Sequence, residues 1–233
     1  MSEAMEKVFG MRQFPLFPLP LVLLPGEMLP LHIFEPRYRQ MLKDVVEFSR
    51  NMFGVTYFDA AATSEGRPAI GSIGCAAEIR EKQALPDGRS NIATFGIVRY
   101  RLFEYAESDA PYFVGKVDFF EDEPEDEAEV NLVTSEVYEL FERVARAAFR
   151  LSGNRGNFPE IPNSGPEQLS FLVCAAFKLD DELKYKMLEM TSTIRRLAEL
   201  KEILLKAVDK MEASAEIHVI SQNNGHGKTK IDF

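Results

Sequence analysis

Residues 15–41 read PLFPLPLVLLPGEMLPLHIFEPRYRQM, and this stretch decides how the chain can fold. Six prolines stand among Leu, Val, Ile and Phe, so the stretch is apolar enough to be buried but too interrupted to form one helix. The stretch is therefore expected to form short extended pieces joined by bends. At Pro36 the character changes, because proline suits the first helical position and apolar residues then recur at helical spacing. The stretch therefore predicts strands that lead into a first helix.

Strand signals dominate the next part of the chain. Residues 52–58 and 112–120 combine aromatic and β-branched side chains, and residues 71–80 alternate as a half-buried strand does. Residues 90–106 are too long for one undisturbed strand and their apolar alternation changes parity, which predicts a bend or bulge near residues 96–98. Several strands without a βαβ rhythm predict a mixed or antiparallel sheet that curls towards a barrel.

An acidic run, EDEPEDEAE at residues 121–129, follows the strands and is interpreted as a solvated connector. Beyond it the apolar period becomes helical, and four helices are expected. Residues 152–165 predict a loop, and the apolar helix that opens at Pro166 is expected to be central to a second core. Asp180 and residues 191–193 can cap the last two helices.

These signals describe an α+β chain in two parts. A frayed lead-in is expected before residue 12. The predicted bounds are residues 12–120 for a β-barrel part with one short helix, 121–130 for an acidic linker, 131–213 for an α-helical bundle and 214–233 for a mobile tail.

Composition excludes some classes of partner and of site. The formal net charge is −10, which disfavours general attraction to nucleic acid or to an anionic membrane. Cys75 and Cys174 lie far apart, so we expect no disulfide framework, no cysteine-based zinc site and reduced cytoplasmic thiols. Prolines interrupt the apolar run near the start, and we expect neither a signal peptide nor a transmembrane span.

No arrangement of residues indicates catalysis. A hydrolytic site needs a nucleophile with a base held nearby, and no nucleophile motif accompanies His32, which is interpreted as a satisfied structural histidine. The phrase NNGHGKT at residues 223–229 partly matches a phosphate-binding loop. However, Gln222 stands where that loop requires glycine, and too few residues follow for its helix. We therefore expect no enzyme activity, no cofactor and no metal.

Three stretches carry a family resemblance. LPGEMLPLHIFEPRYRQML (residues 24–42), GSIGCAAEI (residues 71–79) and PEQLSFLVCAAFKLDDELKYKMLEMTSTIRRL (residues 166–197) resemble the substrate-binding N-terminal domain of Lon-type ATP-dependent proteases. The resemblance extends from about residue 12 to residue 211. It implies a PUA-like β pseudo-barrel followed by an α-helical bundle. The ATPase and Ser–Lys protease modules of complete Lon enzymes do not fit within this length, so we expect a standalone domain protein.

The function that the resemblance implies is non-catalytic binding of unfolded or exposed apolar polypeptide segments. We expect an adaptor or chaperone-like factor in protein quality control, whose partners are polypeptide substrates or a protein such as a protease. Homo-oligomerisation is left open. The alternative, RNA binding by a PUA-like module, rests on analogy between folds, and the acidic balance counts against it.

The candidate site residues all come from the opening stretch. Those expected to contact peptide or to form the rim of a peptide groove are Leu31, Phe34, Arg37 and Tyr38. Those expected to be structural are Pro25, Gly26, Pro30, His32, Glu35 and Pro36. Glu35 and Pro36 have positional roles at a helix start, and an ion pair could fix the barrel to its helix.

Overall fold

The structure is a computed structural model that describes residues 1–59, 66–152, 157–162, 164–177 and 179–224. The chain divides into two compact units. Unit 1 comprises Met1–Glu123 and Cys174–Thr191, and unit 2 comprises Pro124–Val173 and Ser192–Phe233. Part of the predicted loop, part of the predicted tail and most of the NNGHGKT phrase lie outside the described residues.

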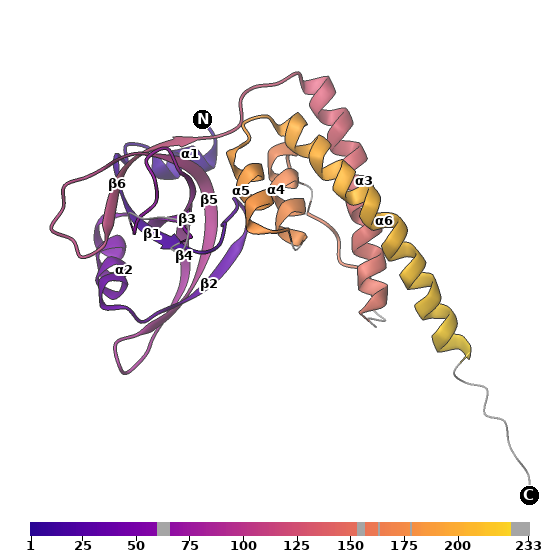
Figure 1. The fold of residues 1–233 in the computed structure, drawn as a ribbon, viewed down its shortest axis with the longest axis horizontal. Helices are drawn as coiled ribbons and strands as arrows, with labels where there is room; N and C mark the ends of the chain where they lie inside the picture. The colour runs from indigo at the N-terminus through magenta and orange to yellow at the C-terminus, as the bar shows by residue number, and fades with distance from the viewer. Residues whose placement is uncertain (60–65, 153–156, 163, 178, 225–233) are drawn as a thin grey trace, which may run out of the picture. The chain divides into compact units, whose positions relative to one another are not determined.

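Unit 1 is built on a sheet that closes on itself (Figure 1). Its strands are β1 (Gln13–Leu19), β2 (Met28–Ile33), β3 (Met52–Tyr57), β4 (Ile73–Ala84), β5 (Ser90–Tyr105) and β6 (Phe113–Phe120). The strand order is β2-β5-β4-β3-β1-β6, and β5 also pairs with β6. β1 and β3 are parallel and the other pairs are antiparallel. The predicted mixed sheet curled into a barrel is confirmed.

Three helices accompany the sheet in unit 1: α1 (Glu3–Val8), α2 (Pro36–Phe48) and α5 (Asp181–Glu189). The prediction of a frayed lead-in is wrong at α1, because Ser2 caps this helix and Val8 is buried. α2 begins at Pro36, as the opening stretch predicts. It covers an apolar cluster that includes Tyr38, Met41 and residues of β1 to β5.

β2 and β6 lie one after the other along the same edge of β5. β2 pairs with residues 90–95 of β5, and β6 pairs with residues 99–105. Between them, Gly96 exchanges backbone hydrogen bonds with the turn before β2, donating to Glu27 and accepting from Gly26. A Cβ atom at Gly96 would lie 2.1 Å from the carbonyl oxygen of Leu24, so this crossing of two backbones needs glycine.

The bulge predicted in β5 is confirmed. Cys75 faces Arg99 whereas Ala77 faces Gly96, so β5 carries one more residue than β4 between these pairs. Burial in the first half of β5 falls on the even-numbered residues. Ala93 and its two neighbours of the same parity are half-buried, while Ile92 is buried.

β4 also departs from its predicted half-buried alternation. Its first residues are buried on both parities. Cys75 and Ala77 belong to the apolar cluster beneath α2, and Ala76 belongs to a second cluster around Tyr100. β4 therefore separates two apolar clusters at this end, which removes the polar face that the alternation predicts.

Unit 2 is helical, with α3 (Glu127–Leu151), α4 (Pro166–Ala176) up to Val173, and α6 (Thr193–Asn224). Within unit 2, α4 has three buried apolar side chains, those of Leu169, Phe171 and Val173. The fully buried Arg196 lies 4.1 Å above the ring of Phe171, and its Nε donates to Ser170 Oγ at 2.7 Å. Burial of α4 is consistent with its predicted central place.

The two units differ from the predicted bounds in two places. α5 falls in unit 1, whereas the bounds 131–213 assigned it to the helical bundle. α6 continues to Asn224, beyond the predicted start of the tail at residue 214. The acidic run is also not uniformly solvated, because the Asp122 side chain is only 6% exposed beside Arg99.

Candidate functional site

β2 has one edge that no strand of the described chain covers. It is the terminal strand of the sheet order and pairs with β5 alone. The Gly96 N–H donates to the Glu27 carbonyl at 2.9 Å, which fixes the phase of the ladder. By the antiparallel alternation, Leu29, Leu31 and Ile33 exchange hydrogen bonds with β5, while the backbone groups of the intervening residues point towards the open edge.

The open edge carries an incomplete set of donors. Met28 and His32 each present an N–H and a C=O group, whereas Pro30 presents only a C=O group. Proline is tolerated in a sheet where its missing N–H faces an unpaired edge. An extended polypeptide could add to β2 here, with one bond fewer than a full ladder.

Exposed apolar and aromatic side chains lie along the outward parity of this strand. We call Met28, Pro30, His32 and Phe34 the β2 surface. Met28 is 68% exposed and Phe34 is 58% exposed. The His32 ring stacks on Phe34 at 6.1 Å, and its Nδ1 lies 2.7 Å from Asn91 Oδ1. An exposed surface of this kind is typical of a site that contacts other molecules.

The inward parity of β2 is structural. Leu29 and Leu31 are half-buried against the apolar cluster beneath α2, and Ile33 is buried within it. Leu31, which was expected to contact peptide, therefore offers less surface to a partner than Met28 does. Met28 was not among the predicted contact residues, although the alternation of residues 28–33 places it on the exposed parity.

A separate hollow opens where α2 begins. Its volume is about 280 Å³. Two guanidinium groups lie over aromatic rings at its lining, Arg37 over Tyr38 and Arg67 over Tyr105, each 4.6 Å from the ring centroid. The residues that line it are Arg37, Tyr38, Arg67, Tyr105, Ala106, Ser108, Ala110, Pro111, Tyr112, Phe113 and Val114. We call this hollow the arginine pocket.

The Glu35 carboxylate partly neutralises the positive charge of the arginine pocket. It precedes Pro36 at the start of α2, but its side chain makes no capping hydrogen bond. Instead its Oε2 lies 2.9 Å from both Nε and Nη2 of Arg37. Burial raises the pKa of Tyr38, so this tyrosine is neutral at physiological pH. The lining thus combines guanidinium charge with neutral aromatic rings.

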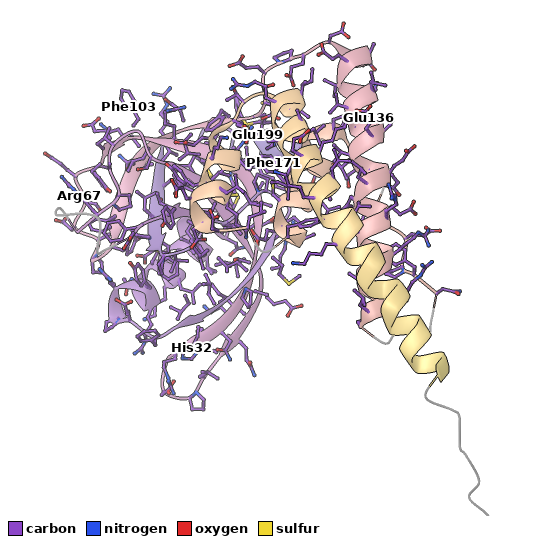
Figure 2. The ribbon with its side chains drawn as sticks, turned by 45° about the vertical axis from the view of Figure 1, so that its right-hand side comes forward. His32, Arg67, Phe103, Glu136, Phe171 and Glu199 are labelled. Atoms are coloured by element: carbon purple, nitrogen blue, oxygen red, sulfur yellow. The ribbon has the colours of Figure 1, made fainter. Side chains whose placement is uncertain are left out.

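The candidate residues from the sequence divide between these two places. Phe34 belongs to the β2 surface, while Arg37 and Tyr38 line the arginine pocket. Figure 2 shows His32 and Arg67 well apart within unit 1, so the surface and the pocket are separate sites. Arg67 and Tyr105 were not predicted, because no motif marks them and only the fold brings them to Arg37.

The remaining residues of the opening stretch hold the backbone. Gly26 has a φ of +81° in the turn before β2, a conformation that favours glycine. Pro25 precedes this turn and is half-buried, and Pro36 occupies the start of α2. His32, which was expected to be a satisfied structural histidine, is exposed on the β2 surface and has its Nδ1 2.7 Å from Asn91 Oδ1.

The described residues lack a metal-binding cluster and an exposed thiol. They contain no group of three or more His, Cys, Asp or Glu side chains that could hold a metal ion. The Cys75 thiol is buried, and burial raises its pKa to about 12, which makes it a poor nucleophile. None of the helices within the described ranges combines the length and apolarity that crossing a bilayer requires.

Comparison with known proteins places these features in a family. The model of the ATP-dependent protease La (LON) substrate-binding domain matches residues 13–206. The chain is 27% identical to the Lon protease of Desulforamulus reducens over 214 residues and 27% identical to that of Parabacteroides distasonis over 221 residues. These matches cover 89% and 86% of this chain, but only 26% of each relative. The chain thus spans about a quarter of the length of these relatives.

Two solved structures share the fold. A Lon N-terminal domain protein from Xanthomonas campestris matches with a TM-score of 0.59 and 23% identity, covering 82% of this chain and 97% of the other. The N-terminal domain of the Mycobacterium avium complex Lon protease matches with a TM-score of 0.59 and 14% identity, covering 85% and 98%. These matches confirm the predicted α+β class, with a PUA-like pseudo-barrel followed by helices.

Proposed function

The chain belongs to the family of the LON substrate-binding domain, and from this premise we propose that it binds extended, apolar polypeptide segments without catalysing a reaction. The observation that carries the proposal is the open edge of β2 beside the exposed side chains of Met28 and Phe34. An extended segment would add to β2 by backbone hydrogen bonds, and its apolar side chains would contact the β2 surface.

The strength of such binding can be estimated from the edge. Each net hydrogen bond contributes about 0.5–1.5 kcal/mol, and burying a side chain such as Phe or Met contributes about 1.5–3 kcal/mol. Ordering the segment offsets much of this sum. A dissociation constant in the tens of micromolar corresponds to about 6 kcal/mol, which these contributions can supply. The proposal is therefore one of weak and transient recognition.

In the cell, this recognition would suit an adaptor or chaperone-like factor in protein quality control. Its partners would be unfolded polypeptides, or a protease to which it delivers them. Cys75 and Cys174 are both buried thiols, which fits the reducing cytoplasm as the place of action. The chain spans only about a quarter of the length of these relatives, so the proposal does not include their ATPase and protease activities.

The test is fluorescence anisotropy with an unfolded, alkylated protein and a panel of labelled apolar peptides, with a folded protein as the negative control. We expect binding at tens of micromolar for the unfolded ligands. Phe34→Gln should weaken it at least threefold. Phe103→Gln is the matched control, because Phe103 is 65% exposed on β5 and Figure 2 shows it apart from His32.

Two outcomes would count against the proposal. Equal signals from unfolded and folded ligands would remove polypeptide binding itself. Equal effects of Phe34→Gln and Phe103→Gln would remove the β2 surface as the site. A labelled RNA belongs in the same panel, and an RNA signal that salt abolishes, without a polypeptide signal, would favour the RNA-binding alternative.

A further inference from the structure

The arginine pocket has the features of a ligand site that β2 does not explain. It is a hollow within unit 1, about 280 Å³ in volume, on a chain whose formal net charge is −10. Arg37 comes from the first turn of α2 and Arg67 from the segment before β4, so the fold brings them together.

Guanidinium groups at a hollow favour an oxyanion. Arginine presents several N–H donors in one plane and can bind a carboxylate or phosphate through two parallel hydrogen bonds. Contacts with the rings of Tyr38 and Tyr105 restrain the two guanidinium groups. Arg37 lies in the first turn of α2, where the helix dipole also favours a negative charge.

The charge and polarity of the groups around the two arginines favour a carboxylate over a phosphate. Glu35 already accepts hydrogen bonds from Arg37, so its carboxylate offsets part of the positive charge that a ligand would meet. A singly charged carboxylate therefore fits better than a doubly charged phosphate. Ala110, Pro111 and Val114 supply an apolar wall beside the charged groups. This wall suits an apolar group attached directly to the carboxylate.

The size of the hollow limits the ligand to about one residue. Pockets for drug-sized ligands run from about 300 to 1,000 Å³, so this hollow lies just below that range. The Tyr112 hydroxyl donates to Asp44 at 2.8 Å, and burial is the main cause that raises its pKa. Tyr112 thus remains neutral and adds no negative charge to the lining.

We propose that the arginine pocket binds a carboxylate carried by a small apolar group. Two sources share this chemistry: the C-terminal residue of a polypeptide, and a free short-chain organic acid. The polypeptide source rests on the proposed function and would make the protein select chain ends. The free-acid source is independent of it.

The experiment compares ligands on the wild-type protein by isothermal titration calorimetry. The probes are a short acetylated peptide ending in leucine with a free carboxylate, the same peptide with a C-terminal amide, 4-methylpentanoate, and phenyl phosphate. We expect the free peptide to bind at least tenfold more tightly than the amide. Measurable binding of 4-methylpentanoate would show that the acid alone suffices. This comparison needs no variant and does not depend on the folding of one.

Variants then locate the site. Arg37→Gln and Arg67→Gln should each weaken binding of the free peptide at least fivefold and leave the amide unchanged. Arg101→Gln is the matched control, since Arg101 is an exposed arginine of unit 1 whose guanidinium also lies near an aromatic ring, that of Phe120 at 6.0 Å. Phe34→Gln should not change the tenfold preference for the free carboxylate.

The results separate this proposal from the proposed function. Equal affinity for the free and amidated peptides, together with no binding of 4-methylpentanoate, would overturn the carboxylate site while polypeptide binding at β2 stood. Binding of 4-methylpentanoate without any polypeptide binding would support the site and overturn the proposed function. Tighter binding of phenyl phosphate than of 4-methylpentanoate, or unchanged binding in both pocket variants, would overturn the site as proposed.

Discussion

Replacing Arg99 by Met is expected to loosen α5 from the barrel of unit 1. The Arg99 side chain is 1% exposed, and its guanidinium lies 2.5 Å from Asp122 Oδ1. The same group donates to the carbonyl of Leu188 at 3.2 Å and to that of Met190 at 2.5 Å, where α5 ends. Methionine has a side chain of similar length but no hydrogen-bond donor, so the substitution removes these polar contacts.

The expected loss of stability follows from the burial of the Arg99–Asp122 ion pair. Removing one partner of a buried ion pair costs about 3–5 kcal/mol, because the other charge stays buried without it. The Asp122 side chain is 6% exposed, so solvent cannot replace the guanidinium. Domains are stable by about 5–15 kcal/mol in total. We therefore expect Arg99→Met to lower the free energy of unfolding of unit 1 by at least about 3 kcal/mol.

The assay is urea denaturation followed by circular dichroism, together with hydrogen exchange of the α5 amides. Arg101→Met, at an exposed position on the same strand, should change stability by less than about 0.5 kcal/mol. The double variant Arg99→Met/Asp122→Leu should recover about 1–3 kcal/mol relative to the sum of the two single changes. A loss below about 1 kcal/mol for Arg99→Met, with α5 exchange unchanged, would refute the reasoning.

Three further predictions concern other positions. Gly96→Ala should destabilise unit 1 by about 2 kcal/mol or more in urea melts, because its Cβ would lie 2.1 Å from the Leu24 carbonyl oxygen; a neutral result would contradict the close crossing. Burial raises the pKa of Cys75 from 9.0 to about 12, so only the unfolded thiol ionises near pH 10 and stability falls there. Melts at pH 8 and pH 10 should show wild type losing about 1.4 kcal/mol more than Cys75→Ala, and parallel losses would exclude the burial effect. Pro30→Thr should add one N–H to the open edge of β2 and tighten polypeptide binding about 2- to 12-fold in anisotropy titrations, whereas unchanged or weaker binding would argue against strand addition.

Local patterns predicted most of the elements of the fold. The helix start at Pro36 and the extra residue in β5 followed from rules about single residues and parity. The burial of β4 did not follow, because a second apolar cluster covers the face that its alternation marked as exposed. The membership of α5 was equally hidden, since the contacts of Arg99 that hold it come from a strand far away in the sequence.

The candidate sites were harder to predict from the sequence than the fold. Phe34 was marked as a contact residue and is exposed on the β2 surface, but Met28 was passed over for its buried neighbour Leu31. Parity alone could have corrected this choice. The arginine pocket could not have been found in this way, because Arg67 and Tyr105 meet Arg37 only through the closure of the barrel.

Pro30 links the structure of the opening stretch to the proposed binding at β2. On the inward parity of β2 it would remove a hydrogen bond to β5, so only the outward parity tolerates it. There it interrupts the edge between the N–H groups of Met28 and His32. A complete open edge would favour pairing between copies of the chain, and proline is one means by which proteins weaken such pairing. In the proposed function the same interruption would keep added polypeptide weakly bound, which is the behaviour that a domain needs if it is to hold unfolded segments and then release them.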